Sequence, residues 1–65
     1  MRRISKNILK LRLSKNWTQE ETAEKLDCDV RWYQRLEGGA YSFSLDTLAR
    51  VAHCFGVDEQ ELLRE

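Results

Sequence analysis

The chain has 65 residues, with 11 acidic and 11 basic side chains, no proline and three glycines. A chain this short has room for one domain over residues 1–65 and a small hydrophobic core, which excludes a multidomain enzyme. Zero net charge argues against a protein that coats nucleic acid without sequence preference. The apolar residues recur at intervals of three and four rather than alternating, which predicts an all-α fold.

The charges are sorted along the sequence. Residues 1–17 contain six basic side chains and no acidic one, whereas residues 18–29 contain five acidic side chains and one basic one. Residues 30–43 return to a small basic excess, with two basic side chains and one acidic one. A basic first helix beside a basic third helix would form one positive surface on a neutral molecule. The same charges also fit solvated helix faces.

The sequence lacks the features of several other protein classes. No apolar run approaches the roughly 20 residues of a membrane span, and no signal peptide is visible, so we expect a cytoplasmic protein with no membrane partner. Cys28 and Cys54 fit that compartment as free, buried thiols. Together with His53 they lack the paired ligand spacing of a zinc site. We therefore expect no metal, no cofactor and no small-molecule ligand.

An enzyme is not expected. The single histidine, His53, is adjacent to a cysteine that we expect to be buried, and no recognisable motif places an acid to orient it. Glu20, Glu21 and Glu24 are expected to form a solvated face that supports a helix start rather than a catalytic pair. A domain of this length also has little room for a cleft that excludes water.

The first predicted helix spans residues 4–15. Ile4, Ile8 and Leu11 recur at helical spacing along one stripe, and Asn16 stands where the chain must leave the helix. Asparagine tolerates the left-handed conformation that such an exit requires.

Two short capped helices joined by a tight turn follow. Thr18 and Glu21 form the S/T-x-x-E pattern of a capping box, so a helix begins just after Thr18. Asp29 is a good N-cap for the next helix, which leaves only residues 27–28 as the connector. So short a connector forces the two helices to cross at a steep angle, with Ala23 as the small residue at the crossing. This is the outline of a DNA-binding helix-turn-helix.

The second of these helices has an inner and an outer side. The inner side of the helix pair is expected to bury Leu26, Cys28, Tyr33 and Leu36. The outer side is expected to expose Val30, Arg31, Gln34 and Arg35. Most of these side chains are long and supply hydrogen-bond donors and positive charge.

Glycines mark the ends of the third and fourth helices. The third helix is expected to stop at Gly38 and Gly39, and the fourth to span residues 45–54 and end at Gly56. The sequence thus predicts short helices without a linker or repeat.

A fifth helix is predicted over residues 59–64, with Asp58 and Glu61 as its cap pair. Apolar residues near this end bear on assembly. Phe55, Leu62 and Leu63 offer more apolar area than so short a segment can bury alone, which predicts a homodimer interface. The alternative for Phe55 and Leu62 is that they close the core of the domain itself.

Several motifs occur together in the order that one family has. They are the opening Thr18-Gln19-Glu20-Glu21, the small Ala23, the close Arg35-Leu36-Glu37-x-Gly39, the start Ser44-Leu45-x-Thr47-Leu48 and the run Ala52-x-x-Phe55-Gly56-Val57. With Arg12 before them, they make residues 17–63 resemble the Cro and lambda-repressor-like helix-turn-helix family. The resemblance implies an all-α domain of five short helices, with the helix-turn-helix at helices 2 and 3.

The resemblance also implies roles for polar side chains. Gln19, at a helix N-terminus, matches the phosphate-contacting glutamine of the family. Val30, Arg31, Gln34 and Arg35 match the positions that face base edges in the major groove. Arginine is suited to guanine, glutamine to adenine and valine to the thymine methyl group.

Arg12 and Glu37 match a buried ion pair that ties the first helix to the recognition helix. The alternative is that they are two surface charges, which usually contribute little to stability.

The sequence departs from the family after the recognition helix. The family often has phosphate-binding basic residues there, whereas residues 38–43 contain none. Each lost phosphate contact lowers the affinity for DNA, so we expect a monomer to bind weakly. The backbone N–H groups of the glycine turn, at Gly39, and the Tyr41 hydroxyl are expected to compensate in part. Asp27 replaces the usual turn glycine and is expected to tolerate that conformation at some strain.

The leading hypothesis is a sequence-specific DNA-binding transcription regulator. It would bind double-stranded DNA as a homodimer, with the third helix of each copy in the major groove of a pseudo-palindromic site. The alternative is a protein-interaction module, antitoxin-like or adaptor, that uses the same fold without reading DNA. Trp32, predicted to be exposed between Arg31 and Arg35, suits a sugar–phosphate backbone or a protein hot spot. It could also fold partly over Leu36 or the first helix.

Overall fold

The computed structural model describes residues 2–39 and 43–64, which form five helices and no strand. In chain order the helices are α1 (Arg2–Ser14), α2 (Gln19–Lys25), α3 (Val30–Gly38), α4 (Leu45–Phe55) and α5 (Glu59–Leu62). The predicted all-α fold with five helices is therefore confirmed for this part of the chain. None of these five helices is long and apolar enough to cross a membrane.

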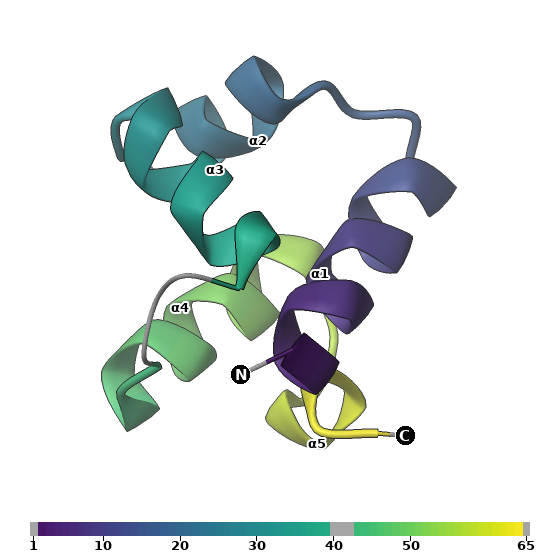
Figure 1. Cartoon of the computed structure of the whole chain (residues 1–65). Helices are drawn as coiled ribbons and strands as arrows, with labels where there is room; N and C mark the ends of the chain where they lie inside the picture. The colour runs from purple at the N-terminus through teal and green to yellow at the C-terminus, as the bar shows by residue number, and fades with distance from the viewer. Residues whose placement is uncertain (1, 40–42, 65) are drawn as a thin grey trace.

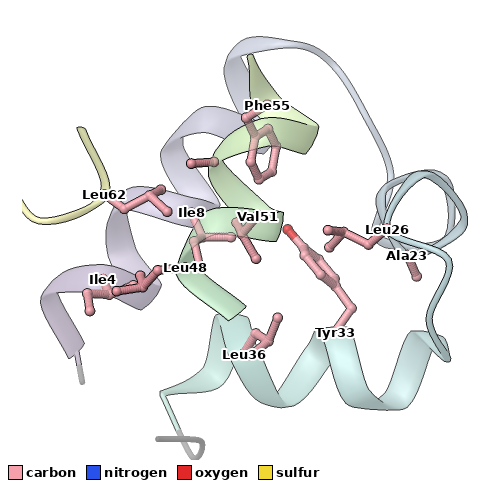
Figure 2. Packing of buried hydrophobic residues seen from close by; sticks show 11 residues of the cluster. Ile4, Ile8, Ala23, Leu26, Tyr33, Leu36, Leu48, Val51, Phe55 and Leu62 are labelled. Atoms are coloured by element: carbon pink, nitrogen blue, oxygen red, sulfur yellow. The ribbon is translucent and has the colours of Figure 1, made fainter. Parts of the chain in front are cut away.

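The helices surround one cluster of buried apolar side chains. α2 packs on α3, α3 packs on α1, and α5 packs on both α1 and α4 (Figure 1). The inward faces of the helices meet in the cluster that Figure 2 shows from close by. Its members are Ile4, Ile8, Ala23, Leu26, Tyr33, Leu36, Leu48, Val51, Ala52, Phe55 and Leu62. Removing this apolar area from water is the main favourable contribution to folding.

Side-chain caps start both helices of the tight turn. The Thr18 hydroxyl accepts a hydrogen bond from the N–H of Glu21 at 3.0 Å, and the Glu21 carboxylate accepts one from the N–H of Thr18 at 2.9 Å. The Asp29 carboxylate accepts a bond from the N–H of Arg31 at 2.7 Å. Both predicted helix starts are confirmed, because these side chains satisfy N–H groups that have no partner inside a helix.

Left-handed residues direct the chain out of α1 and α2. The φ angle is 58° at Asn16 and 57° at Asp27, as expected from their side chains. The turn at Asp27 leads the chain from α2 into α3, and Ala23 is only 2% exposed in the core beneath it. The predicted helix-turn-helix geometry is therefore present.

The predicted ends of the remaining helices are shifted by a few residues. α1 covers residues 2–14 rather than 4–15, and α4 ends at residue 55 rather than 54. Gly39 and Gly56 end α3 and α4 with positive φ angles of 78° and 71°, as predicted.

The fifth helix is shorter than predicted and ends at Leu62 instead of residue 64. The Asn7 side-chain amide donates to the carbonyl oxygens of Leu62 and Arg64, at 2.8 and 2.7 Å. These two bonds hold residues 62–64 against α1. Asp58 caps α5 through the N–H of Gln60, but Glu61 does not complete the predicted cap pair. Its carboxylate forms an ion pair with Arg64 at 3.1 Å instead.

Two of the three residues predicted at a dimer interface lie in the core. Phe55 is 2% exposed and Leu62 is fully buried, so neither is available to a second copy. Trp17 covers Phe55 with a stacked ring, the two centroids lying 5.5 Å apart. The dimer prediction is wrong for Phe55 and Leu62, because the core of the monomer takes up both side chains. Leu63 remains 43% exposed.

Cys28 and Cys54 are free thiols, as predicted, but they are half-buried rather than fully buried. Burial raises the pKa of both thiols, which keeps them protonated at neutral pH. Within residues 2–39 and 43–64, no group of three or more His, Cys, Asp or Glu side chains is placed to hold a metal ion.

Gly38 and Gly56 form a matched pair for a stability test. A Cβ added at either glycine meets no atom within 4 Å, but of the two only Gly56 has a positive φ, 71°. We expect Gly56→Ala to lower the free energy of unfolding by about 1 kcal/mol, because alanine is strained in the left-handed conformation. Gly38→Ala should raise it by up to about 1 kcal/mol, since alanine loses less backbone entropy in a helix. Urea denaturation measures both changes, and equal losses would contradict this account.

Candidate nucleic-acid interface

The exposed side of α3 presents three long polar side chains. Arg31, Gln34 and Arg35 are exposed, and their spacing of three and four residues places them on one side of the helix. The structure therefore brings together three of the predicted base-facing residues. They combine two fixed positive charges with a side-chain amide, and all three can donate hydrogen bonds.

Two neighbouring residues of α3 are less exposed than predicted. Val30 and Trp32 are half-buried and pack against the core cluster. The expectation of an exposed Trp32 is wrong, because the core takes up part of the large indole ring. Trp32 directly follows the exposed Arg31 in the sequence.

A buried ion pair holds α3 to α1. Arg12 Nε bonds Glu37 Oε2, and Arg12 Nη2 donates to Glu37 Oε1 at 3.3 Å. The two side chains are only 12% and 7% exposed, so the predicted buried pair is present and the surface alternative does not hold. Arg12 Nη1 also donates to the carbonyl oxygen of Trp17 at 2.7 Å, which fixes the chain entering α2.

The Tyr33 hydroxyl is a further partner of this carboxylate, and the sequence pattern did not predict it. Tyr33 is fully buried, and Figure 2 shows its ring extending from α3 into the core, between Val51 and Leu26 in that view. Its hydroxyl donates to Glu37 Oε2 at 2.5 Å. The spacing of four residues on one helix was a usable signal, because it places the two side chains next to each other.

Gln19 connects the ion pair to the exposed side of α3. Its Nε2 donates to Glu37 Oε1 at 3.0 Å, and its Oε1 accepts a bond from Gln34 Nε2, also at 3.0 Å. The phosphate-contacting role predicted for Gln19 is compatible with this arrangement, because the amide NH₂ has a second hydrogen to donate. The bond to Gln34 had no local signal, since fifteen residues separate the two glutamines.

The network keeps the carboxylate ionised. Burial by itself would raise the pKa of Glu37, but the hydrogen bonds from Arg12, Tyr33 and Gln19 outweigh it, and the pKa lies below its ordinary value of 4.5. The hydrogen bond to Glu37 raises the pKa of Arg12, whereas burial is the main cause of the raised pKa of Tyr33. At neutral pH the site therefore holds a carboxylate, a guanidinium and a neutral phenol.

The turn after α3 differs from the expected phosphate site. The N–H of Gly39 donates to the carbonyl oxygens of Arg35 and Leu36, so this group closes the helix and is not directed at a phosphate. The Tyr41 hydroxyl, the other expected compensation, lies outside the described residues. A hollow of about 180 Å³ between α1 and this turn is lined in part by Lys6, Gly38 and Gly39. Lys6, which was not among the predicted interface residues, thus lies beside the end of α3.

Similarity to known families agrees with this geometry. A family profile described as helix-turn-helix matches residues 8–62. The chain belongs to the Cro/C1-type helix-turn-helix family. Proteins of this family are DNA-binding regulators, and the match assigns the chain to that class. No curated protein and no solved structure matches the chain significantly.

The lowered pKa of Glu37 predicts a pH-dependent stability. A carboxyl group whose pKa falls on folding stabilises the folded state above its unfolded pKa, and this contribution is lost as pH falls through the folded pKa. We expect the free energy of unfolding to fall as pH drops below the ordinary glutamate value of 4.5, and Glu37→Gln to flatten this decline. Urea denaturation at a series of pH values measures both proteins. A decline that is equally steep in the variant would contradict the assignment to Glu37.

Tyr33→Phe tests how much the Tyr33 hydroxyl contributes to stability. The variant keeps the buried ring but removes the bond to the Glu37 carboxylate, so we expect it to lose about 1.5–3 kcal/mol of folding free energy. The same change in a Glu37→Gln background should cost less, because its charged acceptor is gone. Urea denaturation of the four proteins gives the coupling between the residues. Additive losses would show that the hydroxyl does not act through Glu37.

Proposed function

We propose that the chain is a sequence-specific transcription regulator that binds double-stranded DNA as a homodimer. The helix α3 of each copy lies in the major groove of one half of a pseudo-palindromic site, and the halves are about one helical turn apart. The observation that supports this most is the exposed row of Arg31, Gln34 and Arg35 on a helix that is fixed from within by a buried ion pair. Family membership supports the same assignment.

The proposed contacts divide into base and phosphate contacts. Arg31, Gln34 and Arg35 face base edges, and the half-buried Val30 lies against a thymine methyl group at the edge of the contact. Gln19 contacts a phosphate at the N-terminus of α2, where its side-chain amide and the helix end both favour an anion.

The other proposed contacts lie at the edge of α3. The exposed part of Trp32 lies against the sugar–phosphate backbone. Gly39 contributes by ending α3. Tyr41, which lies outside the described residues, is proposed to donate to a phosphate. Lys6, beside that turn in the hollow between α1 and α3, supplies part of the positive charge that the loop lacks.

The homodimer is proposed to be weak in solution and to form on DNA. Phe55 and Leu62 are taken up by the core, so at this end Leu63 is the apolar side chain left for a second copy. A contact this small cannot hold two copies together without help, because stable interfaces bury much more area. Two adjacent half-sites would supply that help by holding both copies close together.

Selection from a random duplex pool tests the proposed function. We expect binding that weakens as salt is raised and that enriches an inverted repeat. Arg31→Ala and Arg35→Ala should each cost about 1–3 kcal/mol of binding free energy and relax the preference at one position. Lys10→Ala, which removes an exposed charge from α1, is the control and should leave base preference unchanged. Fluorescence anisotropy measures the affinities, and circular dichroism checks that each variant folds.

Absence of binding even at low salt would reject the proposal. It would favour the alternative protein-interaction module, for which the exposed part of Trp32 and its neighbours are the surface to test.

A further inference from the structure

The arginine side chains that the structure describes fall into two groups. Those of the first group donate to the protein itself: Arg3 to the Leu63 carbonyl oxygen, Arg12 to the Glu37 carboxylate, Arg50 to the Leu26 carbonyl oxygen and Arg64 to the Glu61 carboxylate. By contrast, Arg31 and Arg35 are exposed, and neither guanidinium has a hydrogen bond or ion pair within residues 2–39 and 43–64. These two side chains are therefore available to acceptors outside the chain.

The interior of the domain explains why these two charges stay free. Glu37 is the single carboxylate of α3, and its oxygens already accept bonds from Arg12, Tyr33 and Gln19. The Glu37 carboxylate stays charged, but its charge is already paired with Arg12, so it attracts Arg35 only weakly.

Gln34, on the same exposed side, is tied to Gln19 through its amide nitrogen. Of the three polar side chains on this side, the two arginines are thus the ones without an internal partner. Gln34 instead links the exposed side of α3 to α2.

The helix fixes the spacing of the two arginines. Four residues of an α-helix advance by about 6 Å and return to nearly the same side. Consecutive base pairs of B-DNA are about 3.4 Å apart, so a helix lying along the groove sets these two side chains about two base pairs apart.

The chemistry of the guanidinium selects the base. Its donors form a rigid fork, and guanine presents two adjacent acceptors, O6 and N7, to the major groove. Adenine and cytosine place a donor amino group there, and thymine presents a single acceptor beside a methyl group. We infer that each half-site contains two guanines about two base pairs apart, one bonded by Arg31 and the other by Arg35. This inference rests on the proposed function and defines the sequence that the interface reads.

Base analogues test the pairing one atom at a time. In a duplex carrying the selected inverted repeat, 7-deazaguanine replaces each guanine in turn and removes its N7 acceptor. We expect about tenfold weaker binding of the unmodified protein at two positions of each half-site. Arg35→Ala should become insensitive to the analogue at one of these positions, and Arg31→Ala at the other.

Two further variants separate reading from charge. Arg35→Lys keeps the positive charge but lacks the rigid fork, so it should bind the unmodified duplex more weakly than the unmodified protein and show a smaller sensitivity to the analogue. Lys10→Ala, the control, should keep both sensitive positions. Circular dichroism confirms that each variant is folded before its affinity is compared.

The possible results distinguish this inference from the proposed function. Salt-sensitive, sequence-selective binding to half-sites without the guanine pair would overturn the inference alone. So would an analogue effect that is the same in the unmodified protein and in both arginine variants. Absence of sequence-selective binding to any duplex would reject the proposed function, and the inference with it.

Discussion

The arrangement of the first three helices depends on the hydrogen bonds that the Glu37 carboxylate accepts. It accepts hydrogen bonds from Arg12 of α1, from Gln19 of α2 and from Tyr33 of its own helix. A carboxylate that is 7% exposed is unfavourable without such partners, since its charge has lost most of its contact with water. The network therefore makes the position of α3 conditional on α1 and α2 being in place, beyond what apolar packing alone requires.

The same network lies on one side of α3 and leaves the other side exposed. On the buried side, Tyr33 and Leu36 are fully buried, and Glu37 is bonded to the neighbouring helices. On the other side, Arg31 and Arg35 stay exposed. A rigid base lowers the entropy that such a helix loses on binding, so the backbone positions that carry the two arginines are largely fixed before any partner arrives.

The distribution of charge and apolar area limits how strongly one copy can bind. The chain is neutral overall, and the turn after α3 uses the N–H of Gly39 to close the helix. Phe55 and Leu62 fill the core instead of a dimer surface, which leaves Leu63 exposed at the end of α5. Under the proposed function, selectivity therefore comes from base contacts and from the pairing of two half-sites.

The sequence by itself determined the helix starts and ends to within about two residues. It placed the caps at Thr18 and Asp29 and the left-handed exit at Gly56, because these depend on residues within a few positions of one another. Family resemblance added the pairing of Arg12 with Glu37 across the chain. Only the tertiary structure decided that Gln19 joins Gln34 and that the core buries Phe55 and part of Trp32. Those outcomes depend on which helix faces meet across distant parts of the chain, and local sequence patterns do not encode that choice. The pattern of an amphipathic helix predicts that one side will be buried, but the packing of its neighbours determines which residues bury it.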